Sequence, residues 1–101
     1  MVQNFQPDAI VNAAAFTAVD KAEAHVSTAF AVNATAVHNL ASAARACQAR
    51  FIHISTDYVF DGTNKTPYKE QDYTNPQSVY GRTKVSGELL ALAANPDSVI
   101  I

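Results

Sequence analysis

The apolar positions of this chain change their spacing several times, and each change marks a predicted element. Residues 8–15, DAIVNAAA, follow Pro7 with a short apolar run and then small residues, which predicts a buried strand and a loop. From about Ser27 the apolar positions recur every three or four residues as far as Cys47, which predicts a helix of about five turns. Residues 51–55, FIHIS, are a second short apolar run and predict a second strand.

The second half of the chain predicts a long loop, a helix and a third strand. Residues 57–76 are dense in Asn, Asp, Gly, Pro and Tyr, and a loop of ~20 residues is more often functional than idle. Asn75 and Pro76 have the residue types of an N-cap and a first helical position, so we expect a helix from there to about Asn95. Residues 98–101, SVII, predict the start of a third strand. This order of elements indicates an α/β fold with a parallel sheet and right-handed crossovers.

Composition narrows the class of protein without identifying it. The chain has 101 residues, 49% of them hydrophobic and 16% charged, with a net charge of −2. These values suit one small globular domain and disfavour disorder or a nucleic-acid footprint.

The single Cys47 cannot form an internal disulfide, and no apolar run approaches the ~20 residues of a membrane span. The opening MVQNFQPD lacks the pattern of a signal segment, so we expect a cytoplasmic protein. The three histidines have no zinc-like spacing with Cys47, and no metal site is expected.

The stretch SVYGRTK places Tyr80 and Lys84 four positions apart in the second predicted helix, so the two side chains share one face. In open parallel sheets, ligands lie beyond the carboxyl ends of the strands, where the segment containing Thr56 should emerge. We therefore expect Thr56 to face Tyr80. A tyrosine with its ordinary pKa of about 10 is a poor acid–base catalyst at neutral pH, but a nearby ammonium favours the phenolate. Taken alone, however, a Tyr and a Lys at this spacing are more often an ordinary exposed pair.

Four segments together resemble a known family. They are NAAAFTAVDKAE at 12–23, VNATAV at 32–37, STDYVFDG at 55–62 and YGRTK at 80–84. In this order and spacing they resemble the dTDP-4-dehydrorhamnose reductases of the extended short-chain dehydrogenase/reductase superfamily, over nearly the whole chain. The resemblance implies a partial Rossmann-like, doubly wound fold. It also implies an oxidoreductase that uses NADPH or NADH to reduce the C4 keto group of a nucleotide sugar, dTDP-4-dehydro-L-rhamnose, in the last step of dTDP-L-rhamnose synthesis for bacterial surface polysaccharide.

The resemblance assigns catalytic and substrate-binding roles to individual residues. Tyr80 would donate a proton to the substrate oxygen as hydride reaches C4. Lys84 would favour the phenolate and hydrogen-bond the nicotinamide ribose, so that both residues also bind the cofactor. Thr56 would hydrogen-bond the same carbonyl oxygen and share its developing charge, and Asp57 would contact the substrate. Asn33 would stabilise the site from the first helix, although an incidental polar position explains it as well.

A loop that would carry the cofactor follows the first predicted strand. It is made of Ala14, Ala15, Phe16 and Thr17. Small side chains there allow a dinucleotide to approach closely. For the alanines, tight packing of a strand against a helix is an alternative explanation that the sequence leaves open.

Two segments typical of this family do not occur in residues 1–101. They are the Gly-rich phosphate turn GxGxxG and the C-terminal region that builds the sugar-nucleotide pocket. We therefore expect residues 1–101 to form a single partial NAD(P)-binding domain, the middle third of a reductase. Three strands would leave apolar edges and faces uncovered, so we also expect a homo-oligomer.

Three interpretations of the function stay open. The first is an active reductase with a nucleotide-sugar substrate and no nucleic-acid or membrane partner. The second is a non-catalytic relative, because the regulatory subunit of methionine adenosyltransferase has a similar STDYVFDG-like segment and binds a partner enzyme. The third is a fragment that folds or assembles without activity of its own.

Overall fold

Three parallel strands form the sheet of this protein in a computed structural model that describes residues 2–101. They are β1 (Ala9–Asn12), β2 (Arg50–His53) and β3 (Val99–Ile100), in the order β1-β2-β3. In the register, Asn12 is the partner of His53, and His53 is the partner of Ile100. The predicted parallel α/β fold is confirmed. Met1 begins the segment MVQNFQPD, for which no signal peptide is expected, and lies outside the described residues.

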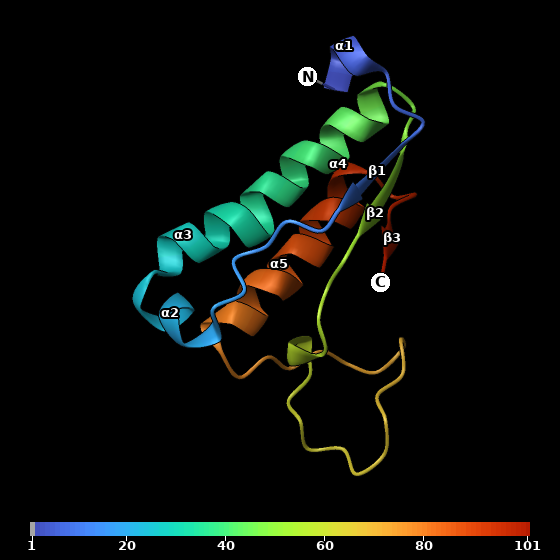
Figure 1. Cartoon of the computed structure of the whole chain (residues 1–101). Helices are drawn as coiled ribbons and strands as arrows, with labels where there is room; N and C mark the ends of the chain where they lie inside the picture. The colour runs from blue at the N-terminus through green and yellow to red at the C-terminus, as the bar shows by residue number, and fades with distance from the viewer. Residues whose placement is uncertain (1) are drawn as a thin grey trace.

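Helices connect the strands and lie against the sheet (Figure 1). The helical elements are α1 (Val2–Phe5), α2 (Val19–Ala24), α3 (Val26–Phe30), the π-helical η1 (Ala31–Thr35), α4 (Ala36–Ala46), the 3-10 turn η2 (Asp57–Val59) and α5 (Val79–Ala94). The predicted helix from Ser27 to Cys47 is confirmed, since α3, η1 and α4 follow one another without a break, as Figure 1 shows. The π-helical segment and α2 were not predicted. Between residues 2 and 101, no helix has the length and apolar character needed to cross a membrane.

The start of α5 differs from the prediction. The helix begins at Val79 rather than at Pro76, and Ser78 is its N-cap, with the side-chain oxygen accepting a hydrogen bond from the Gly81 N–H at 3.0 Å. Asn75 lies outside the helix, and its side-chain amide donates to the Asp61 carboxylate at 3.2 Å. The predicted N-cap is therefore wrong, whereas the predicted end is right, since Asn95 is the C-cap.

The core lies between the helices and one face of the sheet. Its main cluster consists of Val37, Ala41, Ala44, Ala49, Phe51 and Ala91. Most of these side chains are small, so α4 and α5 pack closely together. A second cluster joins Tyr80 to two alanines of α2 and α3. The other face of the sheet carries exposed apolar side chains, since Val11, Val99 and Ile101 are 61%, 51% and 70% exposed.

Candidate active site

Tyr80 and Lys84 lie on the buried face of α5. Tyr80 is 8% exposed and Lys84 is 2% exposed, and the intervening Thr83 is fully buried. An ordinary surface pair would hold both polar heads in water, so the exposed-pair interpretation is wrong. Burying an ammonium is costly unless it finds hydrogen-bond partners, which makes the surroundings of Lys84 informative.

The Lys84 ammonium is anchored to the carboxyl end of β2. Its Nζ donates a hydrogen bond to the carbonyl oxygen of Ile54, the residue that follows the strand, at 2.9 Å. Burial lowers the pKa of Lys84, and the negative charge of Glu88 on the next turn of α5 acts in the opposite direction. Burial raises the pKa of that Glu88 carboxyl, and the Lys84 charge opposes the rise. One of the three ammonium protons is used by Ile54, which leaves two for other acceptors.

Tyr80 contacts the segment that follows β2 at Tyr58. Its ring meets the ring of Tyr58 edge to face, with centroids 5.7 Å apart and planes at 78°. Thr56 is half-buried and lies between Ile54 and Tyr58 in the chain, two residues that both contact α5. The Thr56 hydroxyl caps η2 by accepting from the Tyr58 N–H at 3.3 Å. The structure brings Thr56 to the same end of the sheet as Tyr80, and a contact between the two side chains stays a prediction.

Asp57 is exposed at this end of the sheet, next to the Thr56 hydroxyl. The Thr56 hydroxyl lies 3.4 Å from the Asp57 carboxylate. The carboxylate is therefore available to solvent and to a ligand, and its role in substrate binding stays a prediction.

Asn33 connects the predicted cofactor loop to α5. It lies in the π-helical segment and is fully buried. Its Oδ1 accepts from the Phe16 N–H at 2.8 Å, and its Nδ2 donates to the Phe16 carbonyl at 3.0 Å and to Thr83 Oγ1 at 3.0 Å. Thr83 Oγ1 in turn donates to the Tyr80 carbonyl at 2.7 Å. An incidental polar residue would not satisfy partners in two other elements, so that alternative is wrong.

The predicted cofactor loop emerges at the carboxyl end of β1. Ala14 and Thr17 are exposed, Ala15 is half-buried, and Phe16 packs on the cluster that contains Tyr80. Because Ala14 is exposed, tight packing of a strand against a helix does not explain its small side chain. The loop thus presents backbone and small side chains to solvent close to the Tyr80 cluster.

Sequence reasoning missed a second pair of buried polar residues, Asn12 and His53. They are the last residues of β1 and β2 and are partners in the parallel register. Asn12 Nδ2 lies 3.1 Å from His53 Nδ1. The available signal was a polar residue at the end of each of two apolar strands, but only the register shows that the two residues meet.

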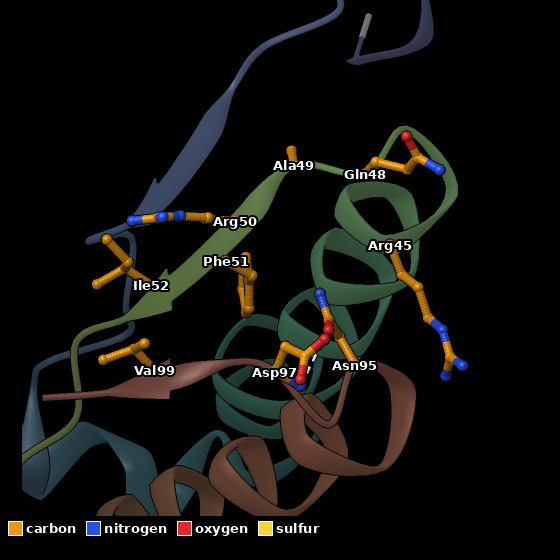
Figure 2. Close-up of a pocket in the computed structure, with 9 residues that line it drawn as sticks. All are labelled: Arg45, Gln48, Ala49, Arg50, Phe51, Ile52, Asn95, Asp97 and Val99. Atoms are coloured by element: carbon orange, nitrogen blue, oxygen red, sulfur yellow. Dashed lines mark hydrogen bonds between the residues drawn. The ribbon is translucent and has the colours of Figure 1, made fainter.

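One hollow in residues 2–101 lies away from these side chains. It measures about 540 Å³ and is at the amino end of β2. It is lined by Arg45, Gln48, Ala49, Arg50, Phe51, Ile52, Asn95, Asp97 and Val99 (Figure 2). A smaller hollow of about 330 Å³ lies beside the candidate site and is lined by Asp57, Tyr58, Phe60, Asp61, Gly62, Tyr68, Gln77 and Ser78. In the same described residues, no group of three or more His, Cys, Asp or Glu side chains is placed to hold a metal ion.

Known proteins match this chain over nearly its whole length. A family model described as the RmlD substrate binding domain matches residues 1–101. The dTDP-4-dehydrorhamnose reductase of Sinorhizobium fredii is 51% identical over 100 residues, which are 99% of this chain and 34% of the relative. The solved dTDP-4-dehydrorhamnose reductase of Clostridium acetobutylicum has a TM-score of 0.95 at 46% identity, covering 98% of this chain and 35% of that one. The Bacillus anthracis reductase, solved in complex with NADP, has a TM-score of 0.95 at 35% identity over the same shares.

This chain therefore spans about a third of the length of the relatives it matches. The matches confirm the predicted resemblance to dTDP-4-dehydrorhamnose reductases and the Rossmann-like fold. Since the family model covers every residue, this chain belongs to the RmlD substrate binding domain family.

Proposed function

We propose that this chain is the catalytic third of a dTDP-4-dehydrorhamnose reductase, in which Tyr80, Lys84 and Thr56 reduce the C4 ketone of the nucleotide sugar. The observation that carries the proposal is the burial of Tyr80 and Lys84 on one face of α5, against the carboxyl end of β2. A structural lysine would more often keep its head in water. An ammonium held at 2.9 Å by a backbone carbonyl is instead fixed where ligands of parallel sheets bind.

Each side chain has one role in the proposed reaction. Tyr80 gives its phenolic proton to the C4 oxygen, and the resulting alcohol keeps both the proton and the added hydride. Lys84 uses one N–H on Ile54, which leaves two for the phenolate and the nicotinamide ribose. Thr56 donates a hydrogen bond to the C4 oxygen and stabilises the negative charge that develops there. Asp57, exposed beside Thr56, binds the substrate.

The residues present fit a nicotinamide cofactor at one end of the sheet. When bound, NADPH or NADH supplies the hydride. The loop from Ala14 to Thr17 offers exposed backbone and small side chains for it, and Asn33 fixes the centre of that loop through Phe16. Residues 1–101 contain no GxGxxG, so we propose that they form a partial NAD(P)-binding domain and that the pyrophosphate is held elsewhere in the full-length enzyme.

The proposal also includes the oligomeric state and the cellular location of the protein. A homo-oligomer of residues 1–101 is supported by the exposed apolar face around Val11 and Val99, which association in water would bury. Sedimentation of residues 1–101 at micromolar concentration tests this, and a clean monomer counts against it. We propose that the enzyme acts in the cytoplasm. Its partner is a nucleotide-sugar substrate, and it binds neither nucleic acid nor a membrane.

The test uses a chimaera in which residues 1–101 replace the matching third of the Sinorhizobium fredii reductase. Ketone-dependent oxidation of NADPH is followed by absorbance. Tyr80→Phe keeps the ring but removes the proton, so turnover should collapse with little change in melting temperature. Thr56→Val should lower turnover by roughly 10²–10³-fold, as expected of an oxyanion donor. Lys84→Met should weaken both turnover and NADPH binding.

Matched controls separate the site from the surface. Tyr73 is 96% exposed, so Tyr73→Phe makes the same chemical change without touching the site. Lys69→Met does the same for an exposed lysine. If Tyr80→Phe kept the turnover of the unchanged chimaera, the role of Tyr80 would be wrong. A chimaera that binds NADPH but reduces no ketone would favour a non-catalytic relative.

A further inference from the structure

Two buried polar side chains that the proposed reaction does not use meet where β1 and β2 end. Asn12 is 5% exposed and His53 is fully buried. They are partners in the register, and their side chains lie on the face that packs against the helices. Asn12 Nδ2 and His53 Nδ1 are 3.1 Å apart. Neither residue has a part in the proposed reaction, so their contact needs another explanation.

A third group fixes the direction of this contact. The Ala14 N–H donates to Asn12 Oδ1 at 3.2 Å. The Asn12 oxygen is therefore taken by the loop, and its amide nitrogen faces His53 as a donor. His53 Nδ1 must then accept, which places the ring proton of neutral His53 on Nε2. Burial and then the positive charge of Lys84 lower the pKa of His53 from 6.5 to about 4, so the ring is neutral at pH 7.

The only side-chain hydrogen bond that holds His53 in the described residues is the one at Nδ1. The ring stacks on Phe51 with centroids 6.3 Å apart, and its buried Nε2 has no hydrogen-bond partner in the described residues. The charged group that acts on it is the Lys84 ammonium on α5, whereas Asn12 on β1 and Ile100 on β3 do not titrate. A protonated ring would turn Nδ1 into a donor facing a donor. Asn12 would then have to rotate, and Ala14 would lose its acceptor.

The loop that follows β1 is thus held at two points. Asn12 holds the backbone of Ala14, and Asn33 holds the backbone of Phe16 on both its N–H and its carbonyl. Only Ala15 lies between them. The first anchor depends on His53, because an amide without that acceptor is free to turn about its side-chain bonds.

We propose that Asn12 and His53 are a positioning pair: neutral His53, protonated on Nε2, orients the Asn12 amide, and Asn12 fixes the start of the dinucleotide-binding loop at Ala14. The proposal rests on the cofactor loop of the proposed function and deepens it. It assigns no contact between either residue and the cofactor. The pair therefore acts on NADPH affinity through the conformation of residues 14–16.

The test compares two replacements of His53 in the chimaera, with NADPH affinity measured by nicotinamide fluorescence in the absence of ketone. His53→Asn keeps an acceptor near the place of Nδ1 but removes much of the buried volume, whereas His53→Leu fills the volume and has no acceptor. Positioning predicts that His53→Leu raises the Kd for NADPH about tenfold, the equivalent of one lost hydrogen bond, and that His53→Asn raises it less. A purely structural role predicts the reverse order, because the smaller side chain leaves the larger cavity. Asn12→Leu should weaken NADPH binding as much as His53→Leu.

Nitrogen-15 NMR of the unchanged chimaera gives a second readout that requires no variant. The imidazole spectrum should show His53 protonated on Nε2 and unprotonated on Nδ1 at pH 7. A proton on Nδ1, an unchanged Kd in both leucine variants, or a greater loss in His53→Asn than in His53→Leu would each overturn the positioning pair. These outcomes are separate from the reductase proposal, because they are measured without ketone. A chimaera that does not bind NADPH at all would overturn both.

Discussion

Gly87 on α5 offers the sharpest test of how the helices place the candidate site. A Cβ atom built on this residue would lie well inside 3.0 Å of the Asn33 carbonyl oxygen, closer than real Cβ atoms come to any neighbour, and 3.6 Å from His53 Nε2. The obstacle is a backbone oxygen of the π-helical segment, which cannot rotate away as a side chain could. In Gly87→Ala the two helices must therefore move apart.

Two effects of opposite sign determine how Gly87→Ala changes the free energy of unfolding. Alanine in a helix is favoured over glycine by about 1 kcal/mol. Overpacking a tight contact costs about 1–3 kcal/mol and occasionally more, and a rigid backbone contact belongs at the upper end of that range. The expected net loss in the free energy of unfolding is roughly 2 kcal/mol. Because Asn33 holds both Phe16 and Thr83, the displacement should also reach the site and lower turnover by up to ~10²-fold.

Urea unfolding and turnover of the chimaera measure both effects. The control is Leu89→Ala on the same helix, where the side chain is 65% exposed and the change should stay within about 0.5 kcal/mol. If Gly87→Ala were instead more stable than the parent by the ~1 kcal/mol of helix propensity, close contact between α5 and Asn33 would be refuted.

Three further predictions concern pH, the long loop and the start of α5. The pKa of His53 falls from 6.5 to about 4 on folding, so below pH 6.5 the unfolded chain binds a proton that the folded chain does not. Stability should be full above pH 6.5 and fall by about 3 kcal/mol as the pH drops to 4, and urea titrations of His53→Asn should lose this part of the dependence. Asp61 accepts hydrogen bonds from three later residues of the loop, so Asp61→Asn should speed cleavage of that loop in limited proteolysis, whereas Glu70→Gln should not. Ser78→Ala should cost about 1 kcal/mol by removing the N-cap, and Asn75→Ala should leave the helix start unchanged.

The parts of the fold that depend on spacing were predictable from the sequence. Apolar residues every three or four positions predicted the helix that became α3, η1 and α4, and two apolar runs predicted β1 and β2. The π-helical segment was not predictable, because nothing in the local sequence around Asn33 distinguishes it from α-helix. The N-cap of α5 was misplaced because Asn75 and Ser78 are both capping residue types, and the residue type alone does not show which of them precedes the first helical turn.

The residues of the candidate site also fall into two groups, those that the sequence indicated and those that it did not. Tyr80 and Lys84 were found because their spacing on one helix is a local pattern, and the resemblance gave Thr56 its role. Asn12, His53 and Gly87 were missed because their importance arises from the register of two strands and the approach of two helices. The residue types alone do not indicate these contacts. Their function becomes visible only in the contacts that they make.

Several of the contacts that hold the site run from a side chain to the backbone. Lys84 bonds to the Ile54 carbonyl, Asn33 to both polar groups of Phe16, and Asn12 to the N–H of Ala14. A backbone partner is present whatever residue occupies the position, so substitutions at Ile54 or Phe16 that keep the local conformation should preserve these bonds. Substitution of Lys84, Asn33 or Asn12 removes the only side chain that can make them. Tolerance to change should therefore be unequal within each bonded pair, with the side-chain member as the sensitive one.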